Sequence, residues 1–277
     1  MKEENNMADG KFTGNAAAIA RKANEYFAEM KHCRPQENLF DEFWREGEVT
    51  LFFGPSRTGK SILAMQVAES VARGHAIDGF ELGAKRKKVL YADLKLSDRQ
   101  FVERYTNEGK QYKFSENLYR QKPPKGQKLV DWLRKMVSEK GFRVIVIDDL
   151  SAVKQTYDGT RETLKLMREL RELRDEFDLS ILLLAGSQEQ RKGELISEAH
   201  MMRSRVLCDA ADSTFAIGVH AGNPQYCYLT QTRTQISAIK WHGNNVPVCS
   251  IQRAEDGFLS MALTTGLLPR STKRCGK

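Results

Sequence analysis

The chain has 277 residues, enough for one or two domains, and its 40% hydrophobic and 29% charged residues exclude a largely disordered protein. The net charge of +8 arises from 44 lysines and arginines against 36 acidic residues, and the whole excess lies in two clusters, at residues 85–88 and 270–277. No apolar run approaches the length of about 20 residues that a membrane helix needs, and the start of the chain lacks signal-peptide features, so we expect a cytoplasmic protein without membrane contact.

The first predicted element is an amphipathic helix over residues 15–33, in which apolar residues recur at helical spacing. Pro35 ends it, because proline cannot continue a helix. This boundary divides the chain into an N-terminal helical arm of residues 1–35, an α/β domain of residues 36–262 and a basic, flexible tail of residues 263–277.

The middle of the sequence alternates apolar strands with helices. Strands are predicted at residues 48–53, 88–93, 143–147 and 180–185. Helices are predicted at residues 60–74, 97–105, 130–139 and 166–177. Residues 109–127 are expected to be irregular. The alternation predicts an α/β fold with a mainly parallel, twisted sheet flanked by helices.

The part of the sequence after residue 210 has the pattern of β-strands. Strands are predicted at residues 213–219 and 225–232, and residues 236–241 are expected to pair with the second of them. These segments would add antiparallel strands at the C-terminal edge of the parallel sheet.

A glycine-rich loop lies between the first of these strands and the helix that follows it. The segment GPSRTGKS matches the pattern GxxxxGK[ST]. Such a loop turns backbone N–H groups toward a phosphate, and the helix N-terminus adds its partial positive charge. The residues predicted to bind nucleotide are therefore Gly54, Pro55, Ser56, Arg57, Thr58, Gly59, Lys60 and Ser61. Lys60 is expected to reach the β- and γ-phosphates of ATP.

A carboxylate follows the apolar strand at residues 143–147. Asp148 lies at the edge where open parallel sheets bind ligands. An apolar strand that ends in aspartate is common, but beside a glycine-rich loop it indicates a group that holds Mg²⁺ through water. We therefore expect Ser61 and Asp148 to be the protein's side chains at a magnesium ion.

The cysteines and histidines do not suggest another metal site. The five cysteines lie far apart without a CxxC pair, and none of the five histidines has a neighbour at the spacing of metal ligands. We expect reduced thiols and no disulfide framework.

Several segments occur in the order and spacing of RecA-like ATPases. They are WREGEVTLFFGPSRTGKS, VLYADLKLSDRQFVERY, VIVIDDLS, SILLLAGSQ and CDAADSTFAIG. Over about residues 40–241 the chain resembles most the small AAA-labelled ATPases of bacterial mobile elements, which are related to RepA- and DnaB-type hexameric helicases. The resemblance implies a RecA-like P-loop core, ATP with Mg²⁺ at subunit interfaces, assembly into a ring or filament, and action on DNA.

The sequence departs from that family at its catalytic positions. By the resemblance, Lys95 occupies the place of the glutamate that orients the attacking water, and a charged lysine cannot accept a proton. Asp93 lies on the same side of the extended chain and is the expected substitute. Ser187 or Gln188 is expected to contact the γ-phosphate, the alternative being a polar strand end. Arg233 is expected to reach a neighbouring subunit's ATP site, the alternative being a solvated arginine.

Basic residues follow the strand at residues 180–185, in the segment that lines the DNA path in RecA-like assemblies. Single-stranded DNA is expected to contact Arg191, Lys192, Arg203 and Arg205 without regard to base sequence. The basic run at residues 85–88 is expected to be a solvated loop instead.

These observations predict a homo-oligomeric P-loop ATPase that acts on DNA in the replication or mobilisation of a mobile element. Hydrolysis is expected to be slow, because the loss of a general base lowers rates by about 10²–10⁴-fold. The alternative is a nucleotide-gated scaffold, which binds ATP and recruits a partner without sustained turnover. A P-loop kinase is a weaker alternative, since nothing in the sequence resembles an arginine-rich lid.

Overall fold

The computed structural model describes residues 22–31, 33–151, 159–191 and 193–264, except for the side chains of residues 202–204. The chain divides into two compact units, residues 1–35 and residues 36–277. The first unit contains helix α1 (Ala23–Met30), which has no buried residue. The helix predicted at residues 15–33 thus ends at Met30, earlier than expected, and its part before residue 22 lies outside the described residues.

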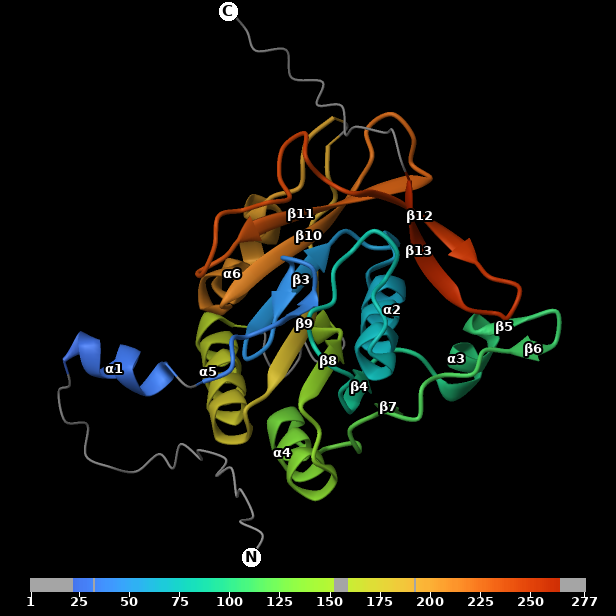
Figure 1. The fold of residues 1–277 in the computed structure, drawn as a ribbon. Helices are drawn as coiled ribbons and strands as arrows, with labels where there is room; N and C mark the ends of the chain where they lie inside the picture. The colour runs from blue at the N-terminus through green and yellow to red at the C-terminus, as the bar shows by residue number, and fades with distance from the viewer. Residues whose placement is uncertain (1–21, 32, 152–158, 192, 265–277) are drawn as a thin grey trace, which may run out of the picture. The chain divides into compact units, whose positions relative to one another are not determined.

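The second unit is built around a nine-stranded sheet in the described part of the chain. Its parallel strands are β3 (Val49–Gly54), β4 (Val89–Asp93), β7 (Leu118–Gln121), β8 (Val144–Asp148), β9 (Ser180–Gly186) and β10 (Ser213–Val219). Its antiparallel strands are β11 (Tyr226–Arg233), β12 (Val248–Arg253) and β13 (Leu259–Thr264). The strand order is β13-β12-β11-β10-β3-β9-β8-β4-β7 (Figure 1). The predicted α/β class, with antiparallel strands at the C-terminal edge, is confirmed.

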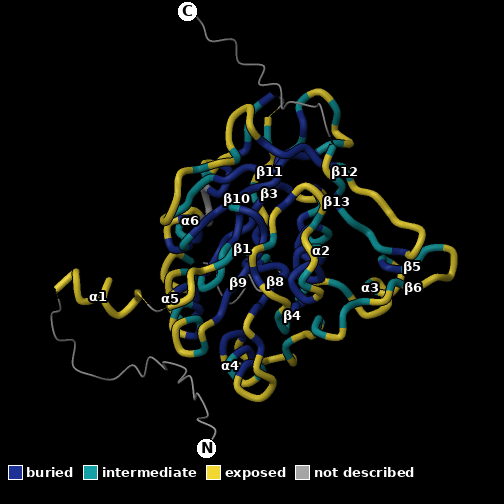
Figure 2. The backbone as a smooth tube through the Cα atoms, viewed as in Figure 1, coloured by how far each residue is buried: buried dark blue, intermediate teal, exposed yellow. Residues whose placement is uncertain are grey.

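Helices cover both faces of this sheet. They are α2 (Lys60–Arg73), α3 (Asp98–Arg104), α4 (Leu129–Lys140), α5 (Thr160–Phe177), the 3-10 helix η2 (Glu198–Ser204) and α6 (Arg205–Ala210). The α2 helix packs on one face, and α4, α5 and α6 pack on the other. Side chains alternate along β3, so Leu51 and Phe53 join the core on the α5 side while Phe52 joins the core on the α2 side. Figure 2 shows the strands as the buried centre of this unit.

Two short antiparallel pairs complete the described strands of the second unit. They are β1 (Asn38–Phe40) with β2 (Trp44–Arg45), and β5 (Thr106–Asn107) with β6 (Lys110–Gln111). Trp44 is completely buried, so the first pair contributes to the core on the α2 side.

The register of the central strands brings the predicted site residues to one edge of the sheet. Gly54 at the end of β3 is paired with Gly186 at the end of β9, and Asp93 at the end of β4 is paired with Asp148 at the end of β8. The backbone N–H of Leu94 donates to the carbonyl oxygen of Asp148 over 2.7 Å, so the segment that follows β4 stays next to the end of β8. Side chains that follow these strands therefore face a common space.

Two expectations about strands were wrong. The expected strand at residues 236–241 does not form, and β12 pairs with β11 in its place. Residues 109–127 are not wholly irregular, because β7 pairs in parallel with β4 at the opposite edge. At the end of the described chain, Leu263 and Thr264 belong to β13, and the rest of the expected tail lies outside the described residues.

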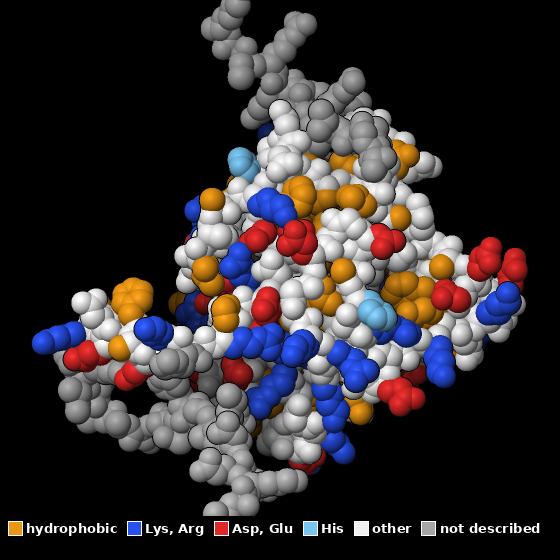
Figure 3. Space-filling view, viewed as in Figure 1, with side chains coloured by type: hydrophobic (Ala, Val, Ile, Leu, Met, Phe, Trp, Pro, Cys, Tyr) orange, Lys and Arg blue, Asp and Glu red, His pale blue; other side chains and the backbone are white. Residues whose placement is uncertain are grey.

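The basic run at residues 85–88 is only partly a solvated loop. Lys85 and Arg86 are exposed, whereas Lys87 pairs with Glu46 over 2.6 Å and Lys88 donates to the Lys140 carbonyl oxygen over 2.8 Å. Figure 3 shows basic side chains gathered over the lower middle of the face drawn, with acidic side chains around them. None of the helices in the described ranges combines the length and the apolar character needed to cross a membrane.

Candidate functional site

The glycine-rich loop joins the end of β3 to the start of α2, where the sequence predicts it. Gly54 has no room for a side chain, because a Cβ there would lie 2.5 Å from the carbonyl oxygen of Ile217 in β10. Gly59 has a φ of 91°, which favours glycine, and a Cβ there would lie 2.1 Å from Met261 Cε in β13. The loop thus lies between β10 and β13; close approach of backbone requires glycine at position 54, and the positive φ favours it at position 59.

Lys60 folds back over this loop. Its Nζ donates to the carbonyl oxygens of Gly54 and Pro55 over 2.8 and 2.6 Å, and the residue is 8% exposed. Burial lowers the pKa of Lys60 to about 8. An anionic ligand would stabilise the charged ammonium, so this position favours a phosphate.

Ser61 and Asp148 lie together, as predicted for a magnesium site. Ser61 Oγ donates to Asp148 Oδ1 over 3.0 Å, and Tyr91 OH donates to Asp148 Oδ2 over 2.7 Å. Asp148 is 2% exposed, and burial raises the pKa of this carboxyl group. A cation beside it would offset the cost of burying its negative charge.

The oxygen atoms of Ser61 and Asp148 fit Mg²⁺, which prefers hard oxygen ligands. Among the described residues there is no group of three or more His, Cys, Asp or Glu side chains that could hold a metal ion. Magnesium that accompanies a nucleotide is bound mainly by phosphates and water, with one or two protein side chains.

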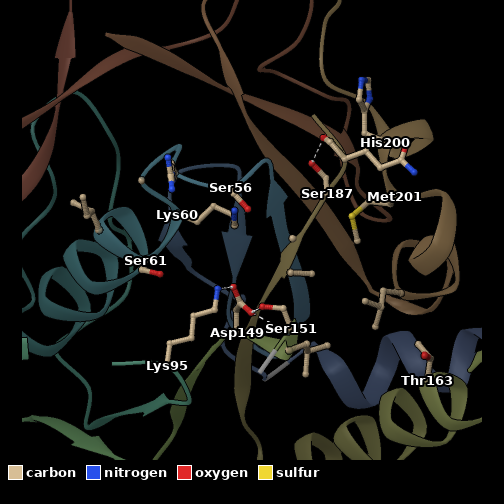
Figure 4. A pocket seen from close by; sticks show the side chains of 18 of the residues that line it. Ser56, Lys60, Ser61, Lys95, Asp149, Ser151, Thr163, Ser187, His200 and Met201 are labelled. Carbon is tan, nitrogen blue, oxygen red and sulfur yellow. Dashed lines mark hydrogen bonds and ion pairs between the residues drawn. The ribbon is translucent and has the colours of Figure 1, made fainter. Parts of the chain in front are cut away.

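The loop opens into a cavity of about 680 Å³, within the range of about 300–1,000 Å³ that is typical of ligand pockets (Figure 4). Its polar lining consists of Ser56, Arg57, Lys60, Ser61, Lys95, Asp149, Ser151, Thr163, Ser187, Gln188 and His200. Further lining residues are apolar or glycine: Gly59, Ile62, Leu150, Leu166, Ala185, Gly186, Met201 and Leu207. Arg104 from α3 and Ile251 from β12 also line it. The ends of four parallel strands and the start of α2 thus enclose one space of the right size for a nucleotide.

Lys95, expected from the resemblance to stand in place of a glutamate, points into this cavity. Its Nζ forms an ion pair with Asp149 Oδ2, as Figure 4 shows. Asp149 Oδ1 accepts hydrogen bonds from the backbone N–H of Ser151 over 2.8 Å and from the Ser151 hydroxyl. A lysine and a carboxylate therefore face the space next to the phosphate loop.

Asp93 does not have the position that the sequence suggested. It is 1% exposed, and Arg120 Nε donates to its Oδ2 over 2.8 Å. Its Oδ1 accepts hydrogen bonds from the backbone N–H groups of Lys95 and Leu96. Both oxygens are engaged within the protein and Asp93 does not line the cavity, so the structure does not bring it to the place expected for a substitute of the catalytic glutamate.

The polar residues after β9, which are expected to contact the γ-phosphate, lie beside the glycine-rich loop. Ser187 and Gln188 both line the cavity. The backbone N–H of Ser187 donates to the carbonyl oxygen of Gly54 over 2.9 Å, which joins this segment to the phosphate loop. Ser187 Oγ donates to the carbonyl oxygen of Gln188 over 2.9 Å.

Arg233, at the end of β11, does not line the cavity of its own chain, and its side chain is 32% exposed but engaged in ion pairs. Its Nε and Nη2 donate to both carboxylate oxygens of Glu198, over 3.2 and 3.1 Å. Nη2 also donates to Asp209 Oδ1 over 2.9 Å. The guanidinium therefore holds η2 and α6 against β11, and any reach toward another subunit would break these contacts.

The expected DNA-contact residues are described only in part. Arg191 and Arg205 are exposed, whereas Lys192 and the side chain of Arg203 lie outside the described residues. The segment that carries them also contributes His200 and Met201 to the cavity. Exposed Arg191 and Arg205 thus flank two cavity-lining residues along the chain.

The sequence reasoning missed several cavity residues. Asp149 had a signal, because it directly follows Asp148 at the end of an apolar strand. Arg104 and Ile251 had no such signal in the sequence. They reach the cavity from α3 and β12, and no local sequence pattern shows that these elements pack beside it.

Comparisons with known proteins agree with this site. A family model described as an AAA domain matches residues 22–190, more than half of the chain. No curated protein matches the chain. Its fold is similar to that in the crystal structure of a KaiC-like protein from the hyperthermophilic archaeon Pyrococcus horikoshii OT3, with a TM-score of 0.52 and 14% identity, over 79% of this chain and 91% of that one. At this identity the likeness concerns the fold alone, and it confirms the RecA-like core.

Proposed function

This chain belongs to the AAA domain family of ATPases with a RecA-like core, and from that premise we propose that it binds Mg-ATP in the described cavity and hydrolyses it slowly. The observation that carries the proposal is the hydrogen bond between Ser61 and Asp148 at the mouth of the glycine-rich loop. It brings a hydroxyl and a buried carboxylate to the side of the cavity where Lys60 lies. Magnesium, when bound, would neutralise phosphate charge there.

The chain's own residues can hold the phosphates without large rearrangement. Lys60 would exchange the carbonyl oxygens of Gly54 and Pro55 for phosphate oxygens, which are stronger partners for an ammonium. Backbone N–H groups of the loop and the N-terminus of α2 would add further donors. Ser187 or Gln188 would contact the γ-phosphate from the end of β9.

The proposal includes DNA as a partner. Arg191 and Arg205 are exposed on the segment that also contributes His200 and Met201 to the cavity. A nucleotide that moves this segment would therefore also move basic side chains, and phosphate backbones attract such side chains regardless of sequence. Together with the sequence resemblance, this supports a role on single-stranded DNA in the replication or mobilisation of a mobile element.

The proposal also includes assembly into a ring or filament with ATP at subunit interfaces. In such an assembly Arg233 would contact the nucleotide of a neighbouring subunit. To do so, its guanidinium would first have to leave Glu198 and Asp209. We therefore propose Arg233 as a trans-acting group that is restrained in the separate subunit.

A second candidate function is a nucleotide-gated scaffold. The observation that favours it is that two carboxylates at the ends of β4 and β8 are paired with basic side chains. Asp93 is paired with Arg120, and Asp149 is paired with Lys95. Neither is free to accept a proton from water in this arrangement, and the loss of a general base lowers rates strongly. Such a protein would bind ATP and change its assembly without sustained turnover.

Steady-state phosphate release, measured with and without single-stranded DNA, separates the two candidates. Lys60→Ala serves as the control for contaminating ATPases. Release that exceeds this control and rises with DNA supports the DNA-dependent ATPase. Tight ATP binding without release above the control supports the scaffold, and absence of ATP binding would overturn both.

A further inference from the structure

The ion pair between Lys95 and Asp149 borders the cavity, and its two side chains are unequally buried. The Lys95 side chain is 43% exposed, whereas the Asp149 side chain is 2% exposed. Figure 4 shows Lys95 directed toward Asp149, with Lys60 and Ser61 bordering the same space. The two residues follow adjacent strands, because the register pairs Asp93 of β4 with Asp148 of β8.

Ser151 donates to one carboxylate oxygen of Asp149, and Lys95 donates to the other. The backbone N–H and the hydroxyl of Ser151 both donate to Asp149 Oδ1. An ammonium has three N–H donors, and Asp149 takes one of them. Because the Asp149 carboxylate is buried, taking Lys95 away from it has a cost, which the contact with a phosphate has to exceed.

The position of Lys95 relative to the glycine-rich loop determines which ligand it can meet. Lys95 and Asp149 both act electrostatically on Lys60, so the three charged groups share one environment. In a P-loop the lysine that opens the helix reaches the β- and γ-phosphates. A third phosphate would therefore lie in the space that Lys95 borders, and a nucleoside diphosphate would leave that space to solvent.

We propose that Lys95 recognises the terminal phosphate of a nucleoside triphosphate, leaving Asp149 as it does so, and that this exchange distinguishes triphosphate from diphosphate. The inference rests on the proposed binding of Mg-ATP and concerns a position where the chain departs from its relatives. The terminal phosphate is the stronger partner because it carries more charge than one carboxylate and is equally able to accept charge-assisted hydrogen bonds.

The exchange has a consequence for Asp149. Once Lys95 has moved to the phosphate, Asp149 Oδ2 is a free acceptor, while Ser151 still holds Oδ1 in place. The carboxylate then faces the cavity beside the phosphate, where it can accept a hydrogen bond from water. Lys95 is thus a nucleotide-contact residue, and it restrains Asp149 until a triphosphate is bound.

Calorimetric titration of the full chain with Mg-ADP and with a β,γ-imido analogue of Mg-ATP tests this proposal. We expect Lys95→Met to lower the ratio of triphosphate to diphosphate affinity about tenfold, which corresponds to about 1.4 kcal/mol, with little change for the diphosphate. Lys95→Arg should keep most of the ratio. Lys85→Met removes an exposed positive charge from outside the cavity and should leave the ratio unchanged.

A second variant moves the ratio in the opposite direction. Asp149→Asn removes the carboxylate charge that competes with the phosphate for Lys95, so this variant should bind the triphosphate more tightly than the wild type does. In the Lys95→Met background the same substitution should raise triphosphate affinity much less. Equal ratios in the wild type and in Lys95→Met, with nucleotide binding intact, would overturn this inference alone. A wild type that binds neither nucleotide would overturn the proposed function and this inference with it.

Discussion

Arg120 Nε donates a hydrogen bond of 2.8 Å to Asp93 Oδ2, and this pair joins the end of β7 to the end of β4. The same guanidinium donates to Asp98 Oδ1 over 2.8 Å and to the carbonyl oxygen of Leu96 over 3.0 Å. Three points of the segment after β4 are thereby fixed by one side chain. The turn that carries Lys95 into the cavity depends on this arrangement.

Asp93→Asn is expected to destabilise the fold. It would leave the Arg120 guanidinium, 14% exposed, without its buried carboxylate, and breaking a buried pair costs about 3 kcal/mol. Urea unfolding measures the loss. Asp98→Asn is the matched control, because it removes an exposed carboxylate from the same guanidinium and should have a much smaller effect. Equal losses in the two variants would show that Asp93 has no special structural role.

The glycine-rich loop and the buried strands could be predicted because their signals are local. GPSRTGKS specifies its own turn, and runs such as VIVID, in β8, are apolar without interruption because both of their faces are covered. β7 gave no such signal, since it reads LYRQ and lies at the edge of the sheet with alternate residues exposed. A short, half-polar edge strand is recognised only once its partner is in place.

The pairing of charges could not be predicted either. Lys95 and Asp149 are far apart in sequence, and their contact follows from the register of β4 against β8. The sequence alone therefore showed Lys95 as a missing glutamate, and it assigned the replacement to Asp93 because that residue was nearby in the chain. In the structure the carboxylate that meets Lys95 in the cavity is Asp149, which follows the neighbouring strand β8.

Lys60→Ala and Ser61→Ala are expected to weaken Mg-ATP binding for different reasons. Lys60→Ala removes the ammonium that faces the phosphates, so affinity should fall by about tenfold or more, also for nucleotide without magnesium. Ser61→Ala removes a metal ligand, so this variant should lose nucleotide affinity only when magnesium is present. Calorimetry with and without chelator checks this, with Ser138→Ala on exposed α4 surface as control. Unchanged affinity in Lys60→Ala would falsify the assignment of the loop.

The N-terminal arm is expected to connect subunits. In its described part, α1 exposes Tyr26, Phe27 and Met30, an apolar group that a partner could cover. We expect full-length protein with ATP to have a larger mass by light scattering than a version that starts at Gln36. Phe27→Ser should lower the mass of the assembly as the truncation does, without shortening the chain. Identical masses for all three would exclude the arm as the connection.

The cysteines offer a test of the C-terminal edge of the sheet. Burial raises the pKa of Cys208, Cys227 and Cys249 to about 12, so their thiolate fraction at pH 8 is very small, and it would grow only as pH rises toward that value. Cys33 is exposed. In a Cys275→Ser background we expect Ellman's reagent to label Cys33 quickly and the other thiols only after unfolding. Fast labelling of Cys227 or Cys249 would contradict the pairing of β11 with β12.

DNA binding is expected to be electrostatic and to depend on the segment from Arg191 to Arg205. Each phosphate contact with single-stranded DNA contributes a slope of about −0.7 to the dependence of log affinity on log salt. Replacing Arg191, Lys192, Arg203 and Arg205 with alanine should therefore flatten the slope by up to ~3 units and leave ATP affinity unchanged. The control, alanine at Lys85, Arg86, Lys122 and Lys125, removes as many charges from exposed positions elsewhere. If the control flattens the slope as much as the variant does, the protein's overall charge attracts DNA and this segment is not the DNA path.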